Sequence, residues 1–420
     1  MARRFSCLII SLILICSLMS GSCVAKEKIV LEWSTWQLTQ IPHKELMEDL
    51  IRNFQKENPN VEIQLTNTGW SQYFDKLQIR LASGTGPDIF TCADDNVKLY
   101  ATSGFAEPLD SYIDLSKYEF CQAAERCNID GKTYGVVWSS LPFTLIYNKA
   151  LFKEAGIENP PTTPEEMIEV AKKLTKGKEQ FGYAGATDSS NPADFYTEFL
   201  VWTIGSGGRV ARNGVPTVNE PQNVEAITLL KKAYDAGIMP KGIDRQLYRK
   251  MFLSGNIAML VDGAYLFDSA RQVSDEAAER LDTAPIFFPS NHVRSYSMYL
   301  CVSKDSKHKD VASKFLEFIL RPEYQEQFVP CVKENPALAN IEVEGTDWIK
   351  DNPWYHGYLQ VDPQDSVPEG LEPYAEEIKK LVARYVGEVF LSDRPAKEAL
   401  DQCQDAVVQM LQQRGYKIPW

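Results

Sequence analysis

The segment Ile29-Val30-Leu31-Glu32-Trp33 opens the succession of elements that decides the fold. Its apolar run is typical of a buried strand. Apolar residues then recur at helical spacing over 46–54, alternate as in a strand over 61–65 and return to helical spacing over 74–81. A Gly-Pro turn leads into the strand-like residues 88–90. This β-α-β-α-β order predicts an α/β domain with a mostly parallel sheet.

A second block of the chain repeats this style. Strand-like runs at 134–138 and 143–147 precede a helix that Thr163 is expected to cap. Pro164 suits its first position, and Glu166 is expected to return to the cap as in a capping box. At 420 residues the chain is too long for one core of ordinary size, so we expect two α/β domains.

No long low-complexity linker divides the two blocks. The chain is therefore expected to cross between two lobes more than once through short strands, which makes a hinge. We place residues 26–138 and 297–330 in the N-terminal lobe. Residues 139–296 and 331–420 are expected to form the C-terminal lobe.

The N-terminus has the pattern of a secretory signal peptide over residues 1–25. Arg3 and Arg4 precede an apolar stretch that is shorter than the roughly 20 residues needed to span a bilayer, which argues against a membrane anchor. Small residues follow, and two interpretations stay open. Signal peptidase would cleave after Ala25, whereas a loose lipobox match would place a lipid on Cys23.

The net charge of −13 argues against nucleic-acid binding, which needs clustered lysine and arginine. No later segment is apolar enough to cross a membrane, so membrane contact is expected through the N-terminus alone. An exported compartment permits disulfides, but the sequence does not choose a pairing. No CxxC motif occurs and the four histidines are scattered, so we expect no zinc site and no cofactor. The cysteines outside the export segment are Cys92, Cys121, Cys127, Cys301, Cys331 and Cys403.

A series of short motifs in a fixed order spans most of the mature chain. They include Leu31-Glu32-Trp33, Phe54-Gln55-Lys56-Glu57-Asn58-Pro59, Leu81-Ala82-Ser83-Gly84, Gly104-Phe105-Ala106-Glu107-Pro108-Leu109, Asp130-Gly131-Lys132-Thr133-Tyr134-Gly135-Val136, Ile146-Tyr147-Asn148-Lys149 and Asp262-Gly263. Their order resembles the family of bacterial extracellular solute-binding proteins that includes the maltose-type receptors of ABC importers.

This resemblance implies the two-lobed periplasmic-binding-protein fold of type II, with a ligand bound in the cleft between α/β lobes that close around it. It also implies a monomer at the extracytoplasmic face of the membrane that docks on the permease subunits of an ABC importer. The chain departs from the family at two places. Ala264-Tyr265 replaces the usual Trp after the Asp-Gly turn, and Arg294-Ser295-Tyr296 replaces the usual Gly-Gly-Tyr. These departures leave the identity of the ligand open.

A sugar site needs aromatic faces for the C–H groups of the ring and planar polar groups for its hydroxyls. Ligands of α/β folds bind beyond the carboxyl ends of parallel strands, which is where we look for both. In the N-terminal lobe, the candidate ligand contacts are Trp36, Gln37, Trp70, Asp94 and Asp95. The competing interpretation is core packing for the tryptophans and helix capping for the aspartates.

The other candidates come from the crossovers and the C-terminal lobe. Asp262 and Tyr265 follow a buried strand predicted at 257–261, although Asp262 also suits a plain turn before glycine. Tyr265 would replace the usual Trp as a stacking face. The remaining candidates are Ser139 and Ser140 at the first crossover, Trp202 before a glycine cluster, Tyr296 at the second crossover and Trp354 in a late aromatic segment.

Enzyme motifs are absent: the chain has no GxSxG, no HExxH and no GxxxxGK[ST]. We therefore expect a binding protein for a sugar or short oligosaccharide and not an enzyme. A glycoside-processing enzyme with two carboxylates is an alternative. A receptor for a polyamine, a polyol phosphate or a metal ion is a nearer one. Asp94, Asp95 and Asp262 would suit a cation, whereas a phosphate would need Arg or Lys at a helix N-terminus. A sensory receptor would share the same site and differ in its partner.

Overall fold

The computed structural model describes residues 28–94, 96–364, 366–392 and 394–420. The predicted signal peptide, Cys23 and Asp95 lie outside the described residues. Within the described part of the chain, no helix is both long enough and apolar enough to cross a membrane.

The first sheet begins with the three strands that the opening segment predicts. β1 (Ile29–Thr35) lies parallel to β2 (Val61–Asn67) on one side and to β3 (Ile89–Ala93) on the other. The long strand β12 (His292–Val302) then pairs antiparallel with β3 and with β6 (Val136–Pro142). The short β13 (Asp362–Gln364) pairs parallel with the start of β12.

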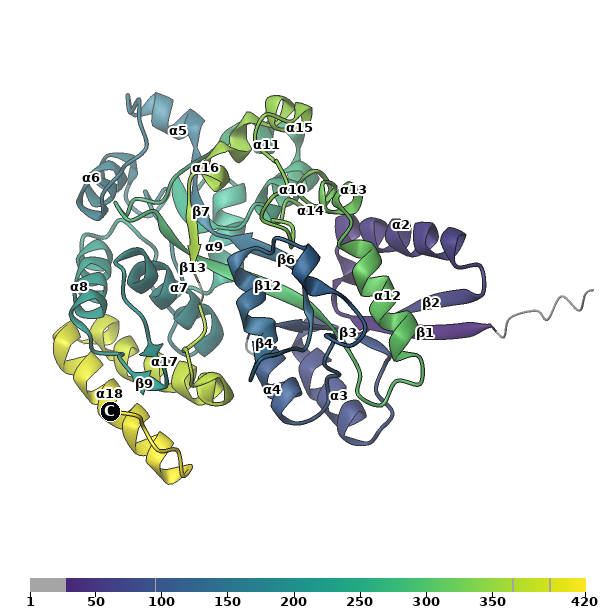
Figure 1. Cartoon of the computed structure of the whole chain (residues 1–420). Helices are drawn as coiled ribbons and strands as arrows, with labels where there is room; N and C mark the ends of the chain where they lie inside the picture. Colours follow the sequence, from purple (N-terminus) through teal and green to yellow (C-terminus); the bar gives the residue numbers. More distant parts are fainter. Residues whose placement is uncertain (1–27, 95, 365, 393) are drawn as a thin grey trace, which may run out of the picture.

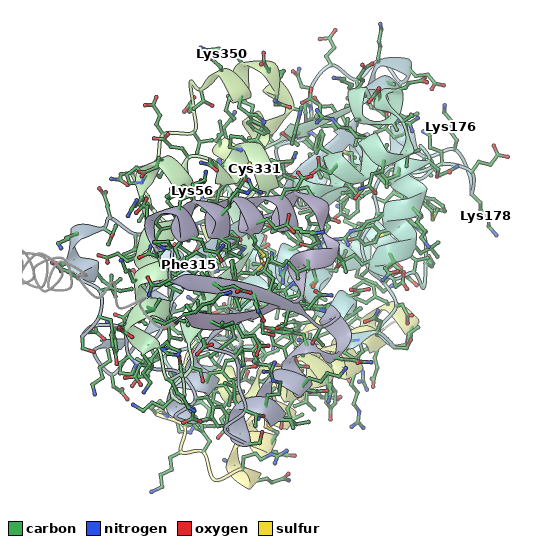
Figure 2. The ribbon with its side chains drawn as sticks, turned by 90° about the vertical axis from the view of Figure 1, so that its right-hand side faces the viewer. Lys56, Lys176, Lys178, Phe315, Cys331 and Lys350 are labelled. Carbon is green, nitrogen blue, oxygen red and sulfur yellow. The ribbon has the colours of Figure 1, made fainter. Side chains whose placement is uncertain are left out.

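Helices cover this sheet (Figure 1), and the core beneath them combines aliphatic and aromatic residues. Phe54 of α2 lies 5.1 Å from Phe315 of α12, ring centre to ring centre, and Figure 2 shows α2 lying along this lobe with Phe315 beneath it. The helices of this part are α2 (Ile41–Glu57), α3 (Trp70–Ala82), α4 (Val97–Thr102), α12 (Lys309–Ile319), α13 (Pro322–Gln325) and α14 (Phe328–Val332), with a small hairpin of β4 (Asn128–Ile129) and β5 (Lys132–Thr133).

The second sheet has β7 (Thr144–Asn148) between β10 (Met259–Asp262) and β11 (Leu281–Ala284), both antiparallel to it. Separate apolar cores surround it. Its helices are α5 (Lys149–Glu154), α6 (Pro164–Leu174), α7 (Pro192–Gly205), α8 (Pro221–Asp235), α9 (Arg245–Leu253), α10 (Tyr265–Val273), α11 (Asp275–Glu279), α15 (Asp347–Asp351), α16 (His356–Leu359), α17 (Ala375–Leu391) and α18 (Ala396–Gln413), with a hairpin of β8 (Ala211–Arg212) and β9 (Val215–Pro216).

Two strands pass from one core to the other, which confirms the predicted multi-crossover arrangement of two lobes. In β6, Trp138 packs in the first core, whereas Leu141 packs in the second. In β12, Val293 packs in the second core and the residues from Met298 to its end pack in the first. A third segment runs beside them, because Asn335 exchanges two backbone hydrogen bonds with Ser140, at 2.7 and 3.0 Å.

The predicted capping box of α6 forms only in part. Thr163 is the N-cap, and its Oγ1 accepts the backbone N–H of Glu166 at 3.1 Å. The Glu166 carboxylate, however, accepts from the backbone N–H and the hydroxyl of Thr162, at 2.9 and 2.8 Å. The prediction that Glu166 returns to Thr163 was wrong, because the preceding threonine offers two donors to one carboxylate oxygen.

Candidate ligand-binding site

Two tryptophans lie at the carboxyl ends of neighbouring parallel strands. Trp36 follows β1 directly and Trp70 begins α3, three residues after β2 ends. The last residues of the two strands, Thr35 and Asn67, pair with each other. This register brings the two indoles to 5.0 Å between ring centres. The register of the two strands thus places both indoles at one edge of the sheet, and their contact with a ligand stays a prediction.

The two indoles differ in exposure. Trp36 is 5% exposed and packs on Tyr73 and Phe74, whereas Trp70 is 50% exposed. Trp70 also lies 6.1 Å from the ring of Tyr296 on the crossover strand β12. Trp36 is thus a support beneath Trp70, and Trp70 offers an apolar face to solvent beside Tyr296.

Two further candidates of the first lobe are engaged inside it. The Asp94 carboxylate accepts the backbone N–H of Ser297 at 3.0 Å and the Tyr299 hydroxyl at 3.1 Å, so it holds β12 against the end of β3. Gln37 is buried, and its Nε2 lies 3.2 Å from the Met298 sulfur. Its Oε1 is buried and has no hydrogen-bond partner among the described residues.

The serines of the first crossover hold the crossing strands together. The Ser139 hydroxyl donates to Glu334, whose other oxygen lies 3.1 Å from Nε2 of His43. The Ser140 hydroxyl lies 2.8 Å from that of Ser295 on β12. These serines therefore occupy the predicted crossover, with their hydroxyls bonded to protein groups.

In the second lobe, Asp262 lies between two arginines of α9. Its Oδ1 accepts from Nη2 of Arg245 at 2.9 Å, and its Oδ2 accepts from Nε of Arg249 at 2.7 Å. The Tyr265 hydroxyl and the backbone N–H of Gly263 also donate to Oδ1. Asp262 is fully buried and satisfied on both oxygens, so it anchors the site from within.

The groups of this cluster shift each other's pKa values. Burial disfavours the ionised form of Asp262, but Arg245 and Arg249 outweigh burial and lower the pKa of this carboxyl well below its usual range. Burial, with a smaller contribution from Asp262, raises the pKa of Tyr265 to about 12. Asp262 is therefore a carboxylate and Tyr265 a phenol at any physiological pH.

Phe143 connects the two lobes between β6 and β7. The Arg245 guanidinium carbon lies 4.6 Å from the centre of the Phe143 ring, and that of Arg294 lies 4.9 Å from it. Arg294 also lies 5.7 Å from the centre of the Tyr296 ring. These contacts complete a continuous group of side chains across the crossing strands, which we call the candidate site. It consists of Trp36, Trp70, Phe143, Arg245, Arg249, Asp262, Tyr265, Arg294 and Tyr296.

Phe143 and the α9 arginines were missed as site residues at the level of sequence. A usable signal existed, because Arg245 and Arg249 stand one helical turn apart, just after Asp244, which caps α9. Two cations on one helical face, ahead of a buried strand that ends in aspartate, would have indicated an ion-pair cluster.

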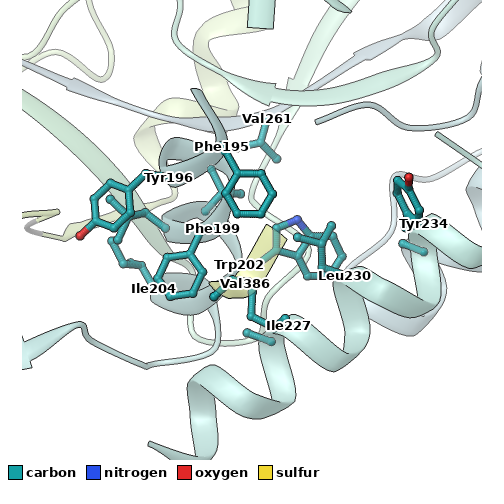
Figure 3. Packing of buried hydrophobic residues seen from close by; sticks show 14 of the residues in the cluster. Phe195, Tyr196, Phe199, Trp202, Ile204, Ile227, Leu230, Tyr234, Val261 and Val386 are labelled. Atoms are coloured by element: carbon teal, nitrogen blue, oxygen red, sulfur yellow. The ribbon is translucent and has the colours of Figure 1, made fainter. Parts of the chain in front are cut away.

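Trp202 and Trp354 lie away from the candidate site. Trp202 is completely buried in the core of the second lobe (Figure 3), and its Nε1 donates to Glu198 at 2.9 Å. Trp354 stacks on Phe267 with ring centres 3.7 Å apart. Trp202 therefore packs inside the main core of the second lobe, whereas Trp354 is partly buried and packs against a smaller core beside Phe267.

Glu198 makes stability depend on pH. Burial raises its pKa from 4.5 to about 7, against the opposing hydrogen bonds from Trp202 and Tyr183. Because the folded pKa lies above the unfolded one, the folded state binds this proton more tightly. The resulting stability is complete below pH 4.5 and is lost as the pH rises through about 7.

We therefore expect this group to lower the free energy of unfolding by about 3 kcal/mol between pH 4.5 and pH 7.5. Urea unfolding of the protein and of Glu198→Gln over this range measures it, since the amide has no proton to lose. The two curves of free energy against pH should diverge by that amount. Parallel curves would contradict the assignment.

Two surface cavities lie elsewhere in the first lobe, away from the candidate site. One of about 500 Å³ is lined by residues 110–116, and one of about 480 Å³ is lined by Leu115, Phe120 and Val136 among others. Both are open and their walls carry none of the candidate site's paired charges, so we take the crossing strands as the site. Among the described residues, no group of three or more His, Cys, Asp or Glu could hold a metal ion.

The chain matches the family model described as bacterial extracellular solute-binding protein over residues 39–326. It belongs to this family. The family assignment predicted from the order of motifs is thereby confirmed.

The chain is similar to binding proteins of known sequence and to a solved structure with the same fold. A Brucella abortus relative is 26% identical over 308 residues, covering 69% of this chain and 74% of that protein. The galactooligosaccharide-binding protein of Bacillus subtilis is 23% identical over 311 residues, covering 70% of each chain. A Listeria monocytogenes ABC substrate-binding protein, solved in complex with cycloalternan, matches with a TM-score of 0.74 and 25% identity, covering 93% of this chain and 100% of the other.

Proposed function

We propose that this protein is the extracytoplasmic receptor of an ABC importer and binds a sugar or short oligosaccharide between its lobes. The observation that carries the proposal is the half-exposed indole of Trp70 beside Tyr296, with Arg249 and Tyr265 at the other end of the candidate site. Sugar rings pack their C–H faces on aromatic rings, and planar polar groups bind their hydroxyls. A relative named for galactooligosaccharide and a similar structure solved in complex with cycloalternan support the same class of ligand.

Transport depends on two populations of the protein, an open form and a closed form. The ligand contacts both lobes only when these close, so it binds the closed form better and raises its population. The permease subunits recognise that closed form and receive the ligand. No bond of the ligand is made or broken, and no cofactor takes part.

The remaining parts of the proposal concern location and organisation. Residues 1–25 serve as a signal peptide, and the mature monomer works at the extracytoplasmic face, either free after cleavage behind Ala25 or lipid-anchored at Cys23. The lobes comprise residues 26–138 with 297–330, and residues 139–296 with 331–420. The proposed first lobe ends at residue 330, but Val332 and Leu338, which follow this boundary, also pack in the core of that lobe.

A thermal-shift screen against mono-, di- and oligosaccharides, with polyamines, polyol phosphates and metal ions alongside, tests the proposal. A ligand that binds only the native state raises the unfolding midpoint. We expect a rise with one group of sugars. If no sugar raises the unfolding midpoint while a polyamine or a metal ion clearly does, the sugar assignment is overturned.

Trp70→Ala is expected to weaken binding of the responding sugar about tenfold or more, because it removes the exposed stacking face. Calorimetric titration measures this loss. Ile79→Ala is a matched control on the same helix, since Ile79 is 68% exposed and lies outside the candidate site. Equal affinities of Trp70→Ala and Ile79→Ala would remove Trp70 from the proposed site.

A further inference from the structure

The candidate site holds two guanidinium groups and one carboxylate. Arg245 and Arg249 both form ion pairs with Asp262, and among the described residues they form none with another carboxylate. The side chains of Arg245 and Arg249 are 11% and 26% exposed, and that of Asp262 is fully buried. The cluster thus carries one positive charge more than its own anion neutralises, in a place largely shielded from water.

Two other carboxyl groups near Arg245 do not take up this charge by direct contact. The Asp194 carboxylate accepts the backbone N–H of Arg245 at 3.1 Å, away from the guanidinium. Glu198 accepts hydrogen bonds from Trp202 and Tyr183 instead. Because burial raises its pKa to about 7, it is largely protonated in mildly acidic solution.

The two arginines also keep unused donors. Nε of Arg245 is buried and has no hydrogen-bond partner among the described residues. Arg249 uses Nε and Nη2 on Asp262 and Tyr265, and its Nη1 bonds to no described residue. A guanidinium offers five N–H groups in a plane that matches a carboxylate or a phosphate.

The position of these donors relates them to the proposed ligand. Arg245 lies over Phe143, and Phe143 links through Arg294 to Tyr296 and Trp70, where a sugar ring would stack. A ligand lying along this group would present its far end to the arginines. A neutral hydroxyl there accepts a hydrogen bond, but an oxyanion also neutralises the surplus charge, and charge-assisted bonds are about twice as strong.

We infer that the ligand of this protein is a saccharide or polyol that carries an oxyanion, a carboxylate or a phosphate, bound by Arg249 and Arg245. This inference rests on the proposed function: for a saccharide it narrows the class of ligand to acidic sugars, and for a phosphate it extends that class to polyol phosphates. The carboxylate of a uronic acid and the phosphate of a polyol phosphate present the same chemistry to the two arginines, so the test has one arm for each.

Calorimetric titration with matched pairs tests it on the whole protein. The carboxylate arm compares α-1,4-galactotriose with α-1,4-trigalacturonate and D-glucose with D-glucuronate, and the phosphate arm compares glycerol with glycerol 3-phosphate. We expect the acidic member of at least one pair to bind tenfold or more tightly than its neutral partner. The preference should fall below threefold in Arg249→Gln and persist in Arg271→Gln, a control at an exposed arginine of α10.

The outcomes separate this inference from the proposed function. Neutral saccharides that bind as tightly as their acidic partners would overturn the inference and leave a sugar receptor standing. A failure of all acidic members to bind would also overturn it, whatever the neutral members do. If Arg249→Gln does not fold, the preference of the unmodified protein for the acidic member of each pair still tests the inference.

Discussion

Replacing Asp262 with asparagine is expected to lower the free energy of unfolding by about 3 to 5 kcal/mol. Asp262 is the carboxylate on which Arg245 and Arg249 both depend, and it is fully buried. The asparagine keeps the shape of the side chain but leaves two largely buried guanidinium groups without a counter-charge. Urea unfolding followed by circular dichroism measures the loss.

Asp347→Asn is the matched control for this variant. Asp347 pairs with Lys350 on the short helix α15, and its side chain is 95% exposed. Exposed pairs of this kind contribute about 0 to 1 kcal/mol, so this variant should unfold almost as the parent does. A loss below about 1 kcal/mol in Asp262→Asn would mean that water or another group compensates the arginines, in contradiction to the cluster described above.

Trp202→Ala is expected to cost about 3 to 5 kcal/mol of stability while leaving the affinity for the ligand unchanged. The indole is completely buried among Tyr183, Phe287 and Phe288, and its removal leaves a cavity and takes a donor from Glu198. Unfolding and calorimetric titration of the same preparation measure both quantities.

Trp420 provides the control, because it is 79% exposed and its loss removes an indole without opening a cavity in the core. Trp420→Ala should change stability by less than about 0.5 kcal/mol. If Trp202→Ala instead lost its ligand affinity while keeping its stability, Trp202 would belong to the binding site after all.

The fold was largely predictable because it depends on local patterns. Periodicity over 46–54 indicated α2, the alternation over 61–65 indicated β2, and the run 257–261 indicated β10. The β-α-β order determines parallel pairing, and parallel pairing brings Trp36 and Trp70 together at one edge. The register of two strands is thus what made the proximity of these two residues of the candidate site predictable.

The contacts within the site depend on how separate elements of the chain pack together. The sequence marks Asp262 as the end of a strand, but only the folded chain shows that Arg245 and Arg249 meet there. Likewise Asp94 follows a strand as predicted, and its partners Ser297 and Tyr299 come from a strand about two hundred residues later. Sequence spacing can place two arginines on one face of a helix, but it does not identify the carboxylate that they meet.

The two misplaced tryptophans have a different cause. Trp202 precedes a glycine cluster, which indicated a loop, yet it belongs to α7, a helix buried on nearly all sides. A helix that is apolar all round gives no amphipathic pattern, so its residues do not reveal whether they face a core or a cleft. Trp354 was predicted from aromatic density alone, and stacking on Phe267 explains that density.

A crystal structure of the protein with the saccharide that gives the largest thermal shift tests most directly whether the crossing strands bind the ligand. The site described above predicts a sugar ring against Trp70 and Tyr296, with a polar group of the ligand bonded to Arg249. A saccharide bound only elsewhere, such as in the surface cavity between Leu115 and Val136, would contradict it.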